Sequence, residues 1–192
     1  MSIEDAINLI FSGNCVLFLG AGYSYQAENV MGNGIPMASE LSKLLDEESG
    51  EDSDWDLSLA AQSYIEAKGE YQIVEFLKDT FKAVGVKESQ EELGKYSWKR
   101  VYTTNYDDVF EFSSLKNKKR STSITLTDRL RDFKNKNGLV VHLNGSIANL
   151  TTPQLSAEFK LTDSSYLTTE FTQSEWITLF RNDLADADAV FF

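Results

Sequence analysis

Short apolar runs constrain the fold of this chain more than any other feature. One run occupies residues 15–19 (CVLFL), a second lies within 99–105 (KRVYTTN), and a third occupies 139–143 (LVVHL). Each run is too short for a buried helix, and an unbroken apolar run is typical of a strand that is covered on both faces. A fourth strand is expected within 188–192 (DAVFF).

Helical patterns separate these strands. Ser2 and Asp5 resemble a capping box, apolar residues follow at helical spacing, and Gly13 suits a helix end, so a helix is predicted over 3–12. Further helices are predicted from Met37 onward and over 55–67, 71–84 and 174–185, and the acidic stretch 46–54 is expected to be an exposed linker. Strands that alternate with helices predict an α/β fold, with a mostly parallel sheet and helices on both faces.

Composition disfavours several classes of protein. The 192 residues are 42% hydrophobic and 25% charged, which is typical of one folded domain and not of a disordered chain. No apolar run approaches the roughly 18 to 20 residues that span a bilayer, and the first residues lack the basic cluster of a signal peptide. We therefore expect a cytoplasmic protein without membrane contacts. The net charge of −12 disfavours direct nucleic-acid binding.

The single cysteine and the one basic cluster offer little chemistry. Cys15 lies inside the first apolar run and is predicted to be a buried side chain, not a reactive thiol. One cysteine can form neither an internal disulfide nor a cysteine-rich zinc site, so no zinc is expected. The basic cluster 116–120 (KNKKR) is predicted to be a solvated loop.

Polar or glycine-rich stretches follow three of the predicted strands: 20–24 (GAGYS), 103–108 (TTNYDD) and 144–147 (NGSI). Ligands bind beyond the carboxyl ends of parallel strands, so we expect a site where these stretches converge. The glycines of the first stretch either let backbone N–H groups approach a phosphate or form a plain tight turn. Tyr25 stands where a G-x-G-x-x-G fingerprint has its third glycine, and no helix is expected to begin at once.

Two side chains in the second stretch have alternative interpretations. Asn105 is suited to hydrogen-bond an amide, a ribose hydroxyl or a positioned water. Asp107 either accepts a hydrogen bond from a ligand or caps the next helix, which would run through 109–112.

In this order, the three stretches resemble the sirtuin-like family of NAD-consuming domains. LFLGAGYSYQAENVMGNGIP (17–36) is similar to the family's G-A-G-x-S loop, which runs on to a glycine–hydrophobic–proline element. YTTNYDDVFE (102–111) resembles the family's T-T-N-Y-D segment, and VVHLNGSI (140–147) resembles the strand that carries a histidine–glycine pair. KLTDSSYL (160–167) and DAVFF also resemble the family, so that the likeness spans essentially the whole chain.

The resemblance implies a single Rossmann-like domain over residues 1–192 that binds NAD at the strand ends. It implies that the pyrophosphate and a ribose lie near Gly20, Ala21, Gly22 and Ser24, and that the nicotinamide end lies near Thr104, Asn105, Asp107 and Asn144. The family's reaction cleaves the bond between ribose and nicotinamide, through oxocarbenium-like charge. Asn105 is the catalytic residue that the resemblance implies, and His142 is the second catalytic candidate.

Departures from the family favour NAD hydrolysis over protein deacylation. Deacylases carry a zinc module of four cysteines, and the Asp-Phe-Arg that follows their proline is replaced here by Met37, Ala38 and Ser39. The domain is more similar to the NADase domains of bacterial anti-phage proteins, which deplete NAD on infection and lie amino-terminal in longer chains. The chain ends inside an apolar stretch, so we expect a longer parent with a carboxyl-terminal sensing region. A phage-derived activator and homo-oligomerisation are further expectations from the resemblance.

One departure bears on catalysis. The family's histidine directly precedes the glycine, where this chain has Asn144, an amide without useful basicity. His142 lies two residues earlier on the same face of the strand. It either acts as the base, which is the favoured interpretation, or holds Asn105 or Asp107 in place, or packs in the core. The alternative function is a catalytically silent module that binds NAD or ADP-ribose and regulates a partner domain.

Overall fold

The computed structural model describes residues 2–54, 56–133, 136–157, 159–161 and 173–192. Its centre is a five-stranded sheet in the order β5–β6–β4–β1–β7, in which every pair of neighbours is parallel. The strands are β1 (Val16–Leu19), β4 (Arg100–Thr103), β5 (Thr122–Thr125), β6 (Leu139–His142) and β7 (Val190–Phe191). The α/β fold with a parallel sheet is therefore confirmed, and it is consistent with a Rossmann-like fold.

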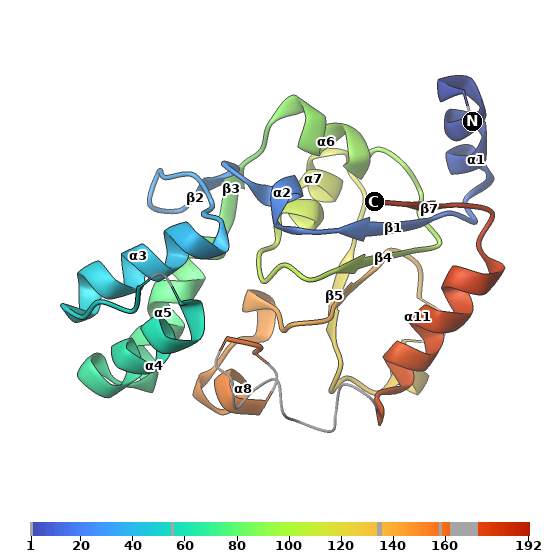
Figure 1. Ribbon diagram of the computed structural model, residues 1–192. Helices are drawn as coiled ribbons and strands as arrows, with labels where there is room; N and C mark the ends of the chain where they lie inside the picture. The colour runs from blue at the N-terminus through green and yellow to red at the C-terminus, as the bar shows by residue number, and fades with distance from the viewer. Residues whose placement is uncertain (1, 55, 134–135, 158, 162–172) are drawn as a thin grey trace.

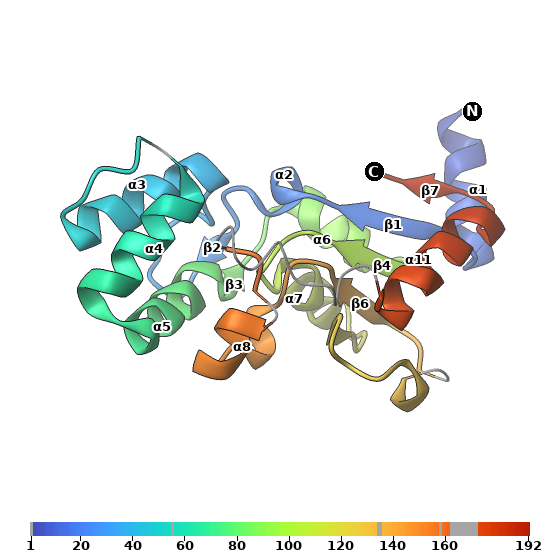
Figure 2. The same cartoon turned by 60° about the horizontal axis from the view of Figure 1, so that its bottom comes forward.

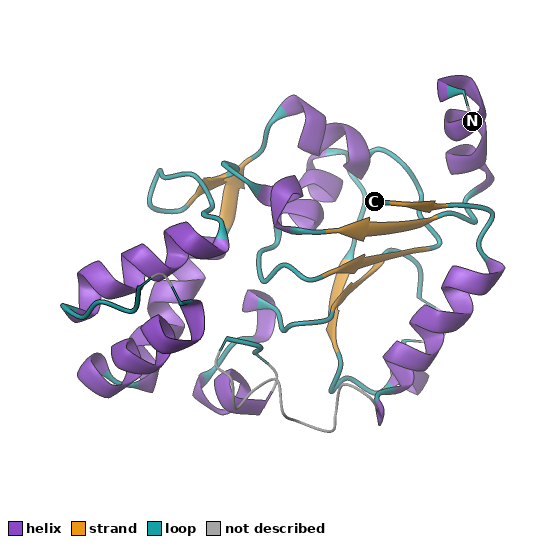
Figure 3. Cartoon of the chain, viewed as in Figure 1, coloured by secondary structure: helices purple, strands orange, loops and turns teal. Residues whose placement is uncertain are grey.

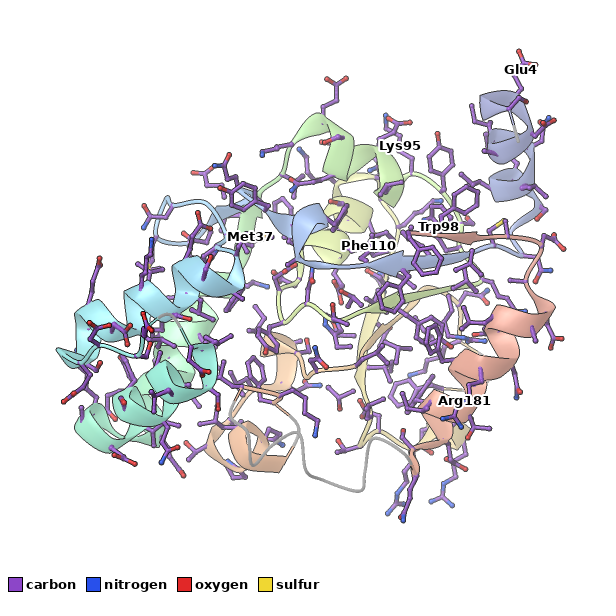
Figure 4. The ribbon with its side chains drawn as sticks, in the orientation of Figure 1. Glu4, Met37, Lys95, Trp98, Phe110 and Arg181 are labelled. Atoms are coloured by element: carbon purple, nitrogen blue, oxygen red, sulfur yellow. The ribbon has the colours of Figure 1, made fainter. Side chains whose placement is uncertain are left out.

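Helices cover both faces of the sheet, as the sequence predicts (Figure 1). On one face, Leu17, Val101 and Val140 pack with residues of α1 (Ile3–Ser12), α6 (Glu88–Gly94) and α7 (Val109–Lys116). Figure 4 shows Trp98 and Phe110 on this face. On the opposite face, Val16, Tyr102 and Val141, which alternate with those residues along the strands, pack with Trp176 of α11 (Glu175–Asp186). Because both faces are covered, β1 carries no polar residue, and the one polar residue of β6 is His142.

A separate group of helices lies beyond the carboxyl ends of the strands (Figures 1 and 2). This helical lobe consists of α3 (Ala38–Ser49), α4 (Leu57–Lys68) and α5 (Glu70–Phe81). Its core is built from Leu41, Leu45, Ile73 and Leu77, all buried. A short antiparallel pair, β2 (Glu28–Asn29) with β3 (Ala83–Gly85), flanks the lobe (Figure 3). Two 3-10 turns, η1 (Leu130–Asp132) and η2 (Ile147–Asn149), and the short helix α8 (Thr152–Ala157) complete the described elements.

The first predicted helix is confirmed at both ends. Ser2 accepts a hydrogen bond from the Asp5 N–H, and the Asp5 carboxylate accepts one from the Ser2 N–H. Gly13 ends the helix with a left-handed φ of 74°, a conformation that costs glycine little. No helix in the part of the chain that the structure describes is long and apolar enough to cross a membrane.

Several local predictions are wrong. The helix predicted over 71–84 ends at Phe81, because residues 83–85 pair with β2 as strand β3. The stretch 46–54 is not a simple exposed linker: α3 continues to Ser49, and Ser53 is buried with its hydroxyl bonded to Asp46. A helix does begin directly after β1, since α2 (Ala21–Ser24) takes Gly20 as its N-cap.

The prediction that the basic cluster 116–120 is a solvated loop is only partly right. Lys116 belongs to α7 and pairs with Glu91, and the Lys119 ammonium donates to the Lys95 carbonyl and to Ser97, so the cluster is only partly a solvated loop. Of the family-like segment 160–167, residues 162–167 lie outside the described residues.

The close approach of α6 to α7 yields a test of the fold. A Cβ on Gly94 would lie 2.6 Å from the Ser113 carbonyl carbon and 2.7 Å from its oxygen. Gly94→Ala must therefore push the two helices apart, and we expect it to lower the free energy of unfolding by about 1–3 kcal/mol. Chemical denaturation measures this. Glu88→Ala, at an exposed position of the same helix, is the control, and equal stability of the two variants would contradict the contact.

Candidate functional site

A cavity of about 210 Å³ lies where the three polar stretches meet the helical lobe. One wall is polar and comes from the segments that follow β1, β4 and β6: Ala21, Ser24, Thr104, Asn105, Tyr106, Asp107 and Asn144. The opposite wall is mostly apolar and comes from the lobe and the segment before it: Ile35, Pro36, Ala38, Leu41, Leu57 and Phe81. An apolar hollow with a few convergent polar groups at the carboxyl edge of a parallel sheet is typical of a ligand site.

A larger hollow of about 900 Å³ adjoins this cavity, and Ile35 and Pro36 line both. It is formed by the loop 25–36 together with parts of α3 and α5, and four glutamates stand on its walls. Among the described residues, none from the segments after β4 or β6 lines it. We therefore assign the candidate site to the smaller cavity, where the side chains capable of chemistry gather.

The polar wall is held by a hydrogen-bond network between two strand ends. The Asn105 Nδ2 donates to the Gly20 carbonyl at 3.0 Å and to Ser24 Oγ at 2.9 Å. Ser24 Oγ donates in turn to Asp107 Oδ1 at 2.8 Å, and the Val109 N–H donates to the same oxygen at 3.1 Å. Ser24, Asn105 and Asp107 are all buried, so this network fixes their side chains in single positions.

The remaining oxygen of Asn105 is available to a ligand. With both amide hydrogens committed, its Oδ1 has no hydrogen-bond partner among the described residues, although the residue lines the cavity. An amide oxygen held in this way accepts a hydrogen bond from a hydroxyl, an amide or a water. Asn144 also lines the cavity, and its Nδ2 donates to the Thr104 carbonyl at 3.2 Å.

His142 lies behind the polar wall and does not line the cavity. Its side chain is 0% exposed, and both ring nitrogens face acceptors. Nδ1 donates to the Asn105 carbonyl at 2.8 Å, and Nε2 donates to Glu111 Oε1 at 2.9 Å. A ring that donates from both nitrogens is an imidazolium. Among the three interpretations of His142, the geometry favours the one in which it holds Asn105 in place; its catalytic role stays a prediction.

Electrostatics agree with a buried His142–Glu111 ion pair. Burial alone would lower the pKa of His142, but the negative charge and hydrogen bond of Glu111 raise it above the ordinary value of 6.5. Burial likewise raises the pKa of Glu111, and the charge of His142 and the hydroxyl of Ser123 outweigh it, so that the pKa of Glu111 is lowered. Ser123 donates to Glu111 Oε1 at 2.5 Å.

Asp107 behaves differently from Glu111. Burial raises its pKa to about 6, and the hydrogen bonds from Ser24 and Val109 and the charge of His142 only partly oppose that rise. A carboxyl group with a pKa in this range and a position on a cavity wall is typical of a functional group. Asp107 also accepts a hydrogen bond from the first N–H of α7, as the capping interpretation predicts, and its contact with a ligand stays a prediction.

The glycines after β1 leave open space. A Cβ added to Gly20 or Gly22 would meet no protein atom within 4 Å, and neither residue has a positive φ. Neither packing nor backbone conformation therefore requires glycine at these positions. A ligand that approaches the backbone closely would require it.

The structure thus brings most of the predicted site residues together around one cavity, with Gly20 and Gly22 beside it and His142 behind it. The sequence analysis missed Glu111, the partner of His142. Its one signal is its spacing, one helical turn after Asp107, but between Phe110 and Phe112 it resembles a solvent-facing helix position. In the described part of the chain, no group of three or more His, Cys, Asp or Glu residues is arranged to hold a metal ion.

Comparison with known proteins bears on this same region. Residues 99–192 match the family model described as a SIR2-like domain. The matched range runs from the residue before β4 to the residue after β7 and includes Thr104, Asn105, Asp107, His142 and Asn144. No curated protein matches the chain.

The His142–Glu111 pair generates a test by NMR, because the chain has one histidine. We expect two ring N–H signals from His142 near neutral pH, and a midpoint of its titration above pH 6.5. Folding raises the pKa of His142. The contribution of the pair to the free energy of unfolding is therefore complete below about pH 6.5 and is lost as the pH rises through the folded-state pKa. Glu111→Gln should lower the midpoint and destabilise the fold by about 3 kcal/mol, whereas the exposed Glu175→Gln should not. A wild-type midpoint below 6.5 would contradict the pair.

Proposed function

We propose that this chain, of which residues 99–192 match a SIR2-like domain, is an NAD glycohydrolase that cleaves NAD to nicotinamide and ADP-ribose. SIR2-like domains bind NAD, and the cavity at the ends of β1 and β4 is the proposed site of cleavage. The observation that carries the proposal is Asn105, a cavity-lining residue whose amide hydrogens are bound by the protein and whose Oδ1 has no partner among the described residues.

The proposed chemistry fits a site of this kind. Cleavage of the bond between ribose and nicotinamide develops positive charge on the ribose, as in glycoside hydrolysis. A fixed amide oxygen at that place orients a ribose hydroxyl or the attacking water, and such orientation contributes strongly to rate when the group is held rigidly. The buried position excludes bulk water, which strengthens the electrostatic effect of the polar wall.

The size of the cavity supports the proposal that only part of NAD lies inside it. Drug-sized ligands occupy roughly 300–1,000 Å³, so a cavity of about 210 Å³ suits the nicotinamide end and not the whole dinucleotide. We propose that the pyrophosphate lies over the open backbone at Gly20 and Gly22, where N–H groups of the first turn of α2 favour an anion.

Hydrolysis is proposed in preference to protein deacylation. A zinc module of four cysteines cannot be formed from the single Cys15, which is buried and whose thiol donates to the Leu9 carbonyl. Further proposals rest on the resemblance alone: depletion of NAD as an anti-phage effector in the cytoplasm, control by a further region of a longer parent chain, a phage-derived activator, and assembly into homo-oligomers.

One alternative function retains support from a specific residue. Asn144 cannot serve as a base, and His142 is enclosed, so a silent module that binds NAD or ADP-ribose without cleaving it is the second candidate. It differs from the hydrolase in one measurable respect, since it would bind NAD tightly and release no nicotinamide.

Asn105→Ala tests the hydrolase. Nicotinamide release by the full chain, supplied with its activator where one is needed, should fall at least about 100-fold, because the orienting oxygen is lost. Asn149→Ala changes an exposed asparagine outside the cavity and should keep the wild-type rate. Tight binding of NAD by the wild type without any nicotinamide release would favour the silent module instead.

Gly22→Ala tests the proposed position of the pyrophosphate. The new methyl group meets open space in the protein and improves helix propensity, so the unfolding temperature should not fall. It would stand where the phosphates approach the backbone, and we expect NAD affinity to weaken about tenfold by calorimetric titration. Unchanged affinity for NAD in a folded variant would contradict this position of the pyrophosphate.

A further inference from the structure

One group on the cavity wall is suited to accept a proton near neutral pH. Among the described residues that line the cavity, only Tyr106 and Asp107 carry side chains that titrate. The Tyr106 hydroxyl already donates to the Lys160 carbonyl at 2.6 Å, and a phenol keeps its proton near neutral pH. Of the lining side chains that the structure describes, Asp107 is therefore the one that changes its charge near neutral pH.

The two residues that the family pattern suggests as a base do not have the required properties. His142 is 0% exposed and donates from both ring nitrogens, so it has neither access to the cavity nor a free lone pair. Asn144 lines the cavity, but a carboxamide has no useful basicity. A hydrolase with this wall needs another proton acceptor.

The contacts of Asp107 leave one of its oxygens free. Ser24 and the Val109 N–H both donate to Oδ1. Oδ2 has no hydrogen-bond partner among the described residues. Two donors on one oxygen fix the plane of the carboxylate and leave the other oxygen to accept from a water in the cavity.

The charged and titratable groups around Asp107 set its basicity. His142 from β6 faces it with a positive charge, Glu111 from α7 with a negative one, and Tyr23 from α2 with a phenol. Burial dominates and raises the pKa of Asp107 to about 6. The group is thus ionised at neutral pH and more basic than an exposed aspartate, a balance that favours general-base catalysis.

We propose that Asp107 is the general base of the reaction and accepts a proton from the attacking water. The inference rests on the proposed NAD hydrolysis. The bond between the ribose C1′ and the nicotinamide nitrogen breaks, and its electron pair goes to the nitrogen. The water oxygen bonds to C1′, and one water proton passes to Asp107 Oδ2 and then to solvent. NAD and water thereby give nicotinamide, ADP-ribose and a proton.

Asp107→Asn is the decisive variant, because an asparagine oxygen can still accept from Ser24 and Val109 while the base is removed. For the full chain with NAD, we expect kcat to fall about 100-fold or more, with the affinity for NAD within a few-fold of wild type. The wild-type rate should decline below about pH 6, and this acidic limb should be absent in the variant. Asp186→Asn, an exposed carboxylate on α11, is the matched control and should retain both the rate and the limb.

Ser24→Ala provides a second measurement that does not depend on the stability of Asp107→Asn. Loss of the Ser24 hydrogen bond, which lowers the pKa of Asp107, should move the acidic limb of the rate to higher pH. A limb that stays in place, or one that persists in a folded Asp107→Asn, overturns the base assignment.

The same experiments separate this inference from the proposed function. If Asp107→Asn cleaves NAD at the wild-type rate, Asp107 is not the general base, and the proposed hydrolase function stands. Wild-type binding of NAD without nicotinamide release refutes the hydrolase itself, and the base with it.

Discussion

A buried ion pair between β6 and α7 underlies the whole candidate site. His142 and Glu111 lie beneath the end of β4, and the ring of His142 holds the backbone carbonyl of Asn105. Ser123 of β5 adds a third strand to the same cluster. Isolated charges are costly to bury, and this pair is retained because each partner is also satisfied by further hydrogen bonds. The cluster therefore joins three neighbouring strands and one helix at the place where the backbone turns into the cavity wall.

The polar wall is a second layer built on this cluster. Asn105 is bound from below through its carbonyl and from the side through its amide, which joins it to Gly20 and Ser24 at the end of β1. The ion-pair cluster and the polar wall are thus two distinct layers, although both include residues of the family-like motifs. His142 lies behind the wall and contacts the Asn105 carbonyl and Glu111, while Asn105 and Asp107 are the residues that line the cavity. The conformational entropy of these side chains is lost on folding and not on binding, which favours a ligand that fits the fixed arrangement.

The sequence predicts the three central strands because they are buried on both faces and are therefore rich in apolar residues, although β4 has only Val101 and Tyr102 between polar residues. It fails for β5, whose Thr122–Thr125 segment has hydroxyl side chains and one buried isoleucine, so no apolar run marks it. The short turn of α2 was missed for another reason, since its four residues are too few to show periodicity. The end of the helix at Phe81 depends on pairing with β2, a contact from distant sequence that no local pattern reveals.

The site residues show the same division between local and long-range information. The family-like motifs identify Asn105, Asp107 and Asn144, which do line the cavity. No motif indicates that Glu111 neutralises His142, because that contact joins residues 31 positions apart. Whether a histidine acts as a base or as a fixed cation depends on such partners, and these become visible only in three dimensions.

The two walls of the cavity come from different parts of the chain. On the polar wall, all the lining residues except Ala21 and Ser24 lie in the range that matches the SIR2-like domain, whereas Ile35, Leu41, Leu57 and Phe81 of the facing wall lie outside that range. Substitutions in the helical lobe can therefore reshape the volume offered to a ligand without disturbing a single hydrogen bond of the polar network. In evolutionary terms, the shape of the cavity and the polar groups on its other wall are free to vary independently.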